Sequence, residues 1–342
     1  MSSTAPRAAF LLSLLCACAP AVTPSAAAQA VPGEPSAQPA AAAAQVSGAR
    51  DGTAAPARKR LFDEALVQST YAEAVAALRD GAQIELREPV PAILLTAAEA
   101  RERRAAFSRT LPKDAGVTAA LDIAADFVFS DTMLGRYLPD EKVLYLIEEV
   151  LESNAGGDRE VAREQLFGVM AHELVHAHDD QVYGGMPSPG AILEIAADGR
   201  RLAEIQMQMT LLEGHAVYAA ELASAHAGRE PLPAITLEEA RGAAVMRGGD
   251  QPLSQLGSGL VNTIARTKLV QYAYGREFCK AAWRFGGEKF LGEVFAHLPL
   301  SMPEIESFER FKQRWAREKE AEEESAGDVQ PAGSAEPESA PR

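Results

Sequence analysis

The stretch HELVHAHDDQ, residues 172–181, carries the strongest structural and chemical signal in this chain of 342 residues. His172 and His176 stand four positions apart, so on an α-helix their imidazoles share one face and can converge on one cation. Glu173 lies about 100° around the helix axis from His172, where it can reach a water molecule held beside that cation. The pattern predicts a zinc site with two His ligands and Glu173 as general base.

Helix boundaries around this stretch follow from its flanks. Asp158 is a suitable N-cap, and the apolar spacing after it predicts a helix to about Gln181. The loop YGGMPSPG interrupts the pattern, and a second long helix is predicted from Ala191 to His226. We therefore expect the chemistry to sit on a pair of helices.

A catalytic zinc site needs a third protein ligand and one open position. The best candidate is Glu213, in the segment LLEGHAVYAAE of the second helix, where Gly214 and Ala216 would let that helix approach the first closely. The competitor is Glu194, which forms an ExxAD pattern with Asp198. Both candidates stay open on spacing alone.

Four further polar residues lie near these positions. Asp180 follows His176 by four residues, so it either orients an imidazole from behind or is solvated. His178 and His226 are expected to be structural or solvated. His215 lies off the face of Glu213, yet it could reach the site from an adjacent turn as an electrophile.

Most of the remaining sequence between residues 60 and 316 has helical apolar spacing. A helix is predicted over Leu61–Gly81, with the glycine as its stop, and Thr96–Glu99 is a capping box that opens the next helix. A further helix is predicted over Val261–Phe285, with a stop at Gly286 and Gly287 and a shorter helix after it.

The segment Gly135–Glu149 is different, because short β-prone runs flank Pro139, Asp140 and Glu141. It predicts a hairpin or an edge strand, in which Val143–Ile147 could align an extended substrate by edge pairing. The predicted fold class is mainly α with a minor sheet: an active-site helix, a ligand-bearing second long helix and a small hairpin.

The combination of HELVHAHDDQ with LLEGHA resembles the gluzincin class of zinc metallopeptidases. It is more closely similar to a bacterial exported family, mostly uncharacterised, that reads HELxHAxxDQ, then LxEGxA, then YxxGxxFxxAxxxxGG. The last element is carried here by Tyr272, Gly275, Phe278, Ala281, Gly286 and Gly287. The resemblance covers residues 131–305. Gln271 replaces a proline common before the tyrosine, and the segment from Ser301 lacks the family's His-Pro.

This resemblance implies a zincin-like fold with His172, His176 and Glu213 as zinc ligands and Glu173 as base. It also implies that the segment at Tyr272 forms part of the active-site wall. The activity implied is hydrolysis of peptide bonds in a peptide or protein substrate. Candidate donors to the oxyanion are three side chains: Tyr272, Tyr274 and His215.

Two hypotheses from other functional classes stay open beside the metallopeptidase hypothesis. One is a non-catalytic zinc-binding or interaction lipoprotein of the cell envelope, although a purely structural site has no use for the unligated base Glu173. The other is a helical envelope scaffold without metal. No oligomeric state is predicted.

The N-terminal residues resemble an export signal, with Arg7 followed by the apolar run AAFLLSLLCACA, too short to span a bilayer. Cys18 fits the acceptor cysteine of a bacterial lipoprotein, and a lipid anchor there would be the only membrane contact. The alternative prediction is cleavage after Ala30 and release to the periplasm or the medium. Cys279 is then the last cysteine of the folded body, expected as a small buried residue, and no internal disulfide is possible.

Composition divides the chain further. The first 18 residues are the predicted signal peptide, and residues 19–57 are rich in Ala, Pro and Ser, which predicts a disordered tether. A helical lead-in over 58–130 precedes the zincin-like domain over 131–316, and 317–342 is predicted as a disordered acidic tail. The net charge of −15 argues against nucleic-acid binding, because nothing would attract a phosphate backbone.

Overall fold

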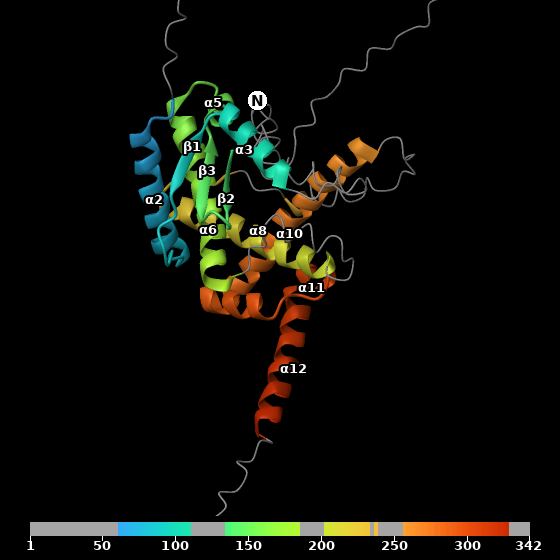
Figure 1. The fold of residues 1–342 in the computed structure, drawn as a ribbon. Coiled ribbons are helices and arrows are strands. Elements are labelled where there is room, and N and C mark those ends of the chain that lie inside the picture. Colours follow the sequence, from blue (N-terminus) through green and yellow to red (C-terminus); the bar gives the residue numbers. More distant parts are fainter. Residues whose placement is uncertain (1–60, 111–133, 185–201, 233–235, 239–255, 328–342) are drawn as a thin grey trace, which may run out of the picture.

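The structure is a computed structural model, and it is mainly helical with one small sheet (Figure 1). It describes residues 61–110, 134–184, 202–232, 236–238 and 256–327. The helices are α2 (Glu64–Ala82), α3 (Ala97–Thr110), α5 (Glu148–Ala155), α6 (Arg159–Tyr183), α8 (Leu202–His226), α10 (Leu256–Ala296), α11 (Met302–Glu306) and α12 (Phe308–Gly327). The strands are β1 (Ala92–Leu95), β2 (Gly135–Leu138) and β3 (Val143–Ile147). The predicted fold class, mainly α with a minor sheet, is confirmed.

The sheet has the strand order β1-β3-β2. The predicted hairpin is present, since β2 and β3 pair antiparallel with Arg136 opposite Tyr145. Strand β1 joins β3 in parallel, with Ile93 opposite the same tyrosine, and the sequence did not predict it. Because β3 is paired on both sides, the prediction that Val143–Ile147 aligns a substrate by edge pairing is wrong. Among the described strands, β2 and β1 are the edges.

Helix α6 begins and ends as its flanking residues predict. The Asp158 side chain accepts hydrogen bonds from the backbone N–H groups of Glu160 and Val161, and the helix ends at Gly184, whose φ of 62° is left-handed. The helix passes through the centre of the molecule, so its residues from Gln165 to Asp179 are mostly buried. A buried helix with polar side chains demands partners for each of them.

Helix α2 does not stop at Gly81, as the sequence suggested. It continues to Ala82, and the left-handed cap is Gln83 with φ 56°. A Cβ atom added to Gly81 would lie 2.6 Å from the Cβ atom of His226. The glycine therefore serves the close approach of α2 to the end of α8.

The capping box before α3 is confirmed. The backbone N–H of Thr96 donates to Oε2 of Glu99 at 2.7 Å, and the backbone N–H of Glu99 donates to Oγ1 of Thr96 at 3.2 Å. These reciprocal bonds satisfy donors that the first helical turn leaves without intrahelical partners.

Helices α8 and α10 hold the C-terminal half of the site. The described part of α8 begins at Leu202, and the predicted start at residue 191 lies outside the described residues. Helix α10 has non-helical backbone angles at Gly286 and Gly287, which confirms the predicted stop there. The chain turns at these two residues and resumes as a shorter helical stretch.

Two hydrophobic clusters hold these elements together. The first joins α2, the sheet, α6 and α8, so the segment before residue 131 and the segment after it share one core. The second joins α8, α10, α11 and α12. Leu222 of α8 packs against both clusters, which places α8 between them.

The C-terminal segment is helical further than predicted. Helix α12 continues to Gly327, past the predicted start of the acidic tail at residue 317, and extends away from the body (Figure 1). Charged side-chain pairs lie along its exposed part, among them Lys319 with Glu322 at 3.2 Å. Residues 328–342, the predicted signal peptide with Cys18 and the tether lie outside the described residues. Among the helices that the structure describes, none has the length and apolar content of a membrane span.

Candidate metal centre

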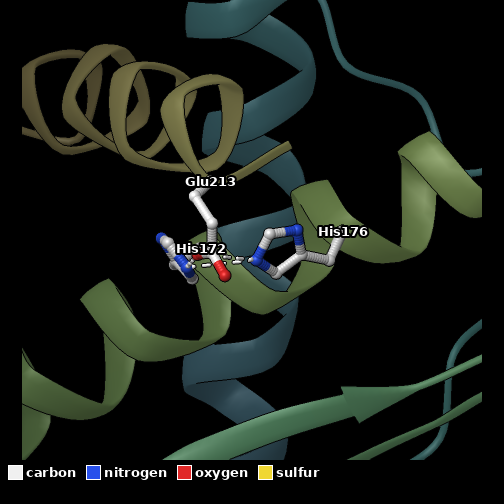
Figure 2. A group of neighbouring side chains, drawn as sticks. All are labelled: His172, His176 and Glu213. Atoms are coloured by element: carbon white, nitrogen blue, oxygen red, sulfur yellow. Dashed lines mark hydrogen bonds and ion pairs between the residues drawn. The ribbon is translucent and has the colours of Figure 1, made fainter. Parts of the chain in front are cut away.

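Three potential metal ligands converge between α6 and α8. Figure 2 shows His172 and His176 on α6 and Glu213 on α8, all turned toward one point. The two Nε2 atoms are 3.2 Å apart, and each lies 3.5 Å from Oε2 of Glu213. The side chains of His176 and Glu213 are 6% and 5% exposed and that of His172 is 14% exposed, so the point is reached from the side of His172.

The spacing of these three atoms fits a tetrahedral cation. Zinc bonds to His nitrogen and carboxylate oxygen are about 2.0–2.1 Å long, so two ligand atoms on a tetrahedral ion lie about 3.3 Å apart. The observed separations of 3.2, 3.5 and 3.5 Å match that edge. Two imidazoles and one carboxylate are also the donor types that zinc prefers. The residues present therefore fit the metal.

The electrostatic environment of His176 and Glu213 also favours a positive charge. Burial alone would lower the pKa of His176, but the adjacent Glu213 carboxylate raises it above its ordinary value. A cation at this point is thus stabilised by the carboxylate, whether the cation is a proton or a metal ion.

Glu173, the predicted base, is buried and fixed by the sheet. Its Oε2 accepts a hydrogen bond of 2.8 Å from the backbone N–H of Tyr137, on edge strand β2. The hydroxyl of the same tyrosine donates to Oδ2 of Asp180 at 2.8 Å. One residue of β2 thereby holds two positions on α6, nearly two turns apart.

The role of Asp180 differs from both alternatives that the sequence offered. It neither contacts an imidazole nor stands free in solvent, because it accepts from the Tyr137 hydroxyl. Burial, then this hydrogen bond, raises the pKa of Tyr137. Tyr137 could not be identified as a partner of Glu173 in advance, because any residue of a strand offers the same backbone donor.

Of the predicted oxyanion donors, one lies beside the metal centre. The ring of Tyr272 is 6.0 Å from that of His172, nearly perpendicular to it, and the residue is 4% exposed. Tyr274, two residues on, instead lines a cavity of about 500 Å³ with Phe278 and Phe308. We therefore retain Tyr272 and not Tyr274 as part of the site.

His215 does not point at the metal centre, which corrects the electrophilic role predicted for it. The residue is fully buried, with Nδ1 2.9 Å from Oδ1 of Asp179 and Nε2 3.4 Å from Oε2 of Glu288. Both ring nitrogens are thus directed at carboxylates, and neither is available to an oxyanion between α6 and α8.

The approach predicted for Gly214 is real, but its partner helix is a different one. A Cβ atom on Gly214 would lie 2.1 Å from the carbonyl carbon of Gly275, and one on Gly275 would lie 2.1 Å from the carbonyl oxygen of Thr210. The backbones of α8 and α10 therefore touch beside Glu213. This contact, not one with α6, explains the glycines in both motifs.

The remaining sequence candidates divide as follows. His178 is structural, with Nδ1 2.9 Å from the carbonyl oxygen of Glu85, while His226 is exposed at the end of α8. Cys279 is buried, its thiol donates to the carbonyl oxygen of Leu211, and burial raises its pKa, so it is the predicted small buried residue. Glu194 lies outside the described residues, and Glu213 is the acid found with the two histidines.

Comparisons with known proteins add little to this geometry. No protein-family model matches the chain, and no curated protein matches it. A similar solved structure is that of a candidate hydrolase with a novel fold from Chloroflexus aurantiacus. It is 19% identical, the alignment covers 77% of this chain and 93% of that chain, and the TM-score is 0.48. A likeness of this size carries no conclusion, so the assignment depends on the residues of the site.

Proposed function

We propose that this protein is a zinc-dependent hydrolase that cleaves peptide bonds, with His172, His176 and Glu213 as ligands. The observation that carries the proposal is the convergence of these three side chains at the edge lengths of a tetrahedral zinc site. Glu173, unligated but immediately adjacent in sequence, supplies what a structural zinc site does not need. The resemblance of the motifs to gluzincins supports the same class of chemistry.

His172, His176 and Glu213 would hold the zinc ion, which would supply a Lewis acid that makes a water molecule more acidic and polarises a carbonyl group. The task of Glu173 is to take the proton from the attacking water and return it to the leaving amine. The Tyr137 N–H occupies Oε2 of Glu173 and fixes the carboxylate, which leaves Oε1 for the proton. Tyr272, packed beside His172, is the proposed donor to the developing oxyanion.

The edge strand β2 is the proposed guide for an extended substrate, in place of β3. It lies beside α6, and its residue Tyr137 bonds to the base. A peptide aligned along this edge would bring its carbonyl groups past the metal centre. Export and lipid anchoring at Cys18 stay part of the proposal, on the strength of the N-terminal sequence alone.

The test compares zinc-loaded wild type with Glu173→Gln on a denatured protein substrate, with new N-termini counted by mass spectrometry. The amide oxygen still accepts from the Tyr137 N–H, so the fold and the zinc are kept while the rate falls at least about 100-fold. Glu160→Gln, an exposed acid on the same helix, is the control and keeps full activity.

Two results would contradict the proposal. If the zinc-loaded wild type cleaves no peptide bond, the peptidase hypothesis is wrong, and a non-catalytic zinc-binding protein is the function that the site then supports. If Glu173→Gln cleaves as fast as the wild type, Glu173 is not the base.

A further inference from the structure

A second buried polar centre lies beside the metal centre, and the proposed mechanism does not use it. We call it the carboxylate–imidazole cluster. Its members are Asp179, His178 and Tyr183 on α6, His215 on α8 and Glu288 on α10. Asp179 and His215 have fully buried side chains, and the side chain of Glu288 is 16% exposed. Burial of this many ionisable groups is costly unless they serve one another.

The contacts of the cluster form a continuous chain across three helices. His215 lies between two acids, with Nδ1 2.9 Å from Asp179 and Nε2 3.4 Å from Glu288. Oε1 of Glu288 in turn lies 3.3 Å from Nε2 of His178 and accepts from the Tyr183 hydroxyl. Each carboxylate in this chain therefore faces an imidazole.

The cluster continues the same stripe of α6 that carries the metal ligands. Positions 172, 176, 179 and 183 recur at helical spacing and share one face. The first two belong to the metal centre, and Asp179 and Tyr183 belong to the cluster. On α8 the two centres are even closer, since Glu213 and His215 are two residues apart.

This shared framework means that the cluster fixes the register of α8 against α6. Sliding α8 by one turn, about 5.4 Å, would separate His215 from Asp179 and Glu213 from the two histidines together. Glu288 adds a third anchor, because it follows the backbone break at Gly286 and Gly287 and reaches His215 from α10.

Electrostatics supports the pairing that the distances show. Burial alone would lower the pKa of His215, but Asp179 and Glu288 raise it to about 10. Burial alone would raise the pKa of Glu288, but His178, His215 and Tyr183 lower it to about 2.

We infer that Asp179, His215 and Glu288 are positioning residues for the proposed metal centre: they hold α8 where the Glu213 carboxylate meets His172 and His176. The inference rests on the proposed zinc site and deepens it. None of the three is a proposed zinc ligand, so their effect must appear in the affinity for zinc rather than in the chemical step alone.

The experiment uses the full chain as wild type, Asp179→Asn, Glu288→Gln and a control, Ser224→Ala. The first two keep the shape of the side chain and remove its charge. Ser224 is also buried on α8 but lies three turns from Glu213, so its loss tests whether any buried polar change on α8 matters. For each protein, the zinc dissociation constant is measured by competition with a chromogenic chelator, and the metal-free melting temperature is measured separately.

We expect Asp179→Asn and Glu288→Gln to weaken zinc binding about 10- to 100-fold, the cost typical of a lost outer-shell partner. The cobalt-loaded variants should also show altered visible absorption bands, which report the geometry at the metal. Ser224→Ala should bind zinc and cobalt as the wild type does, whatever its melting temperature.

The possible failures are distinct. Zinc affinities and cobalt spectra equal to wild type in both folded variants, even with lower melting temperatures, would overturn the inference and leave the zinc site intact. No zinc bound by the wild type would overturn the proposed site and the inference with it. If Asp179→Asn does not fold, Glu288→Gln decides on the same two readouts, because its side chain is partly exposed and its loss is better tolerated.

Discussion

The metal centre and the carboxylate–imidazole cluster are built from the same two helices but differ in charge balance. In the cluster, each imidazole faces a carboxylate, and the 2.9 Å contact of His215 with Asp179 is a direct hydrogen bond. In the metal centre, two imidazole nitrogens face each other at 3.2 Å, and one carboxylate lies 3.5 Å from both. The first arrangement pairs imidazoles with carboxylates, whereas the second directs two imidazoles at one carboxylate and is best completed by a cation.

Buried polar side chains thus have two different arrangements in this protein. The cluster joins three helices through contacts between carboxylates and imidazoles, and the candidate metal centre gathers three donors that could hold an ion. The two are close enough along α6 and α8 that a change in either must be measured against both.

The largest expected effect comes from supplying the cation. Zinc at 1,000 times its dissociation constant should raise the free energy of unfolding of the wild type by about 4 kcal/mol, because it binds only the folded chain. His176→Ala removes one ligand and should abolish this effect. Denaturant titrations with zinc and with excess chelator measure it. Equal stabilisation of His176→Ala would mean that zinc binds elsewhere.

The next effect comes from separating α8 from α10 beside both centres. Gly214→Ala places a methyl group 2.1 Å from the backbone of Gly275, which should cost about 3 kcal/mol of stability and weaken zinc binding. Gly292→Ala is the matched control, because its methyl would lie 3.4 Å from Tyr183, an ordinary contact. Equal stability of both variants would show that the helices separate freely.

A third effect concerns the cluster alone, and acid should remove it. The lowered pKa of Glu288 contributes stability above its ordinary value of 4.5, and the contribution is lost as pH falls toward about 2. The groups that face it are His178, Tyr183, His215 and, across His215, Asp179.

Glu288→Gln should therefore be less stable than the wild type by about 2 kcal/mol at pH 6, the scale of a charged hydrogen bond. Unfolding of the metal-free proteins from pH 6 to 2 should show this difference shrinking with acid. A difference that does not depend on pH would rule out the carboxylate charge as its cause.

The smallest effect concerns the contact between β2 and α6. Tyr137→Phe removes the hydroxyl bond to Asp180 but keeps the backbone N–H on Glu173, so we expect a loss of about 1 kcal/mol and a reduced rate of hydrolysis. Tyr145 lies on the neighbouring strand β3, and Tyr145→Phe removes a comparable bond to Glu141, so this variant should leave the rate unchanged. If the two variants have equal rates, the hydroxyl bond from Tyr137 to Asp180 does not help to position the base.

The sequence predicted the local part of the metal centre well. His172, Glu173 and His176 lie within two turns of one helix, so helical spacing alone fixes their relation. The third ligand, Glu213, was harder to predict, because its partners lie on another helix and Glu194 stands in a similar sequence pattern.

Contacts between distant segments could not be predicted. Strand β1 pairs with β3 across a long separation, the donor to Glu173 is a backbone group common to all strands, and Glu288 carries no motif. Gly214 predicted a close approach of another helix, but a glycine does not specify which helix that is. Contacts of this kind depend on tertiary packing, which cannot be predicted from the spacing of residues in one sequence.

Metal content of the purified full chain tests the central claim most directly. Elemental mass spectrometry of the wild type and of Glu213→Ala, each after zinc reconstitution and desalting, requires no substrate. The proposed site predicts about one zinc ion per chain in the wild type and none retained in Glu213→Ala. A wild type without zinc, or a Glu213→Ala variant that retains it, would contradict the account.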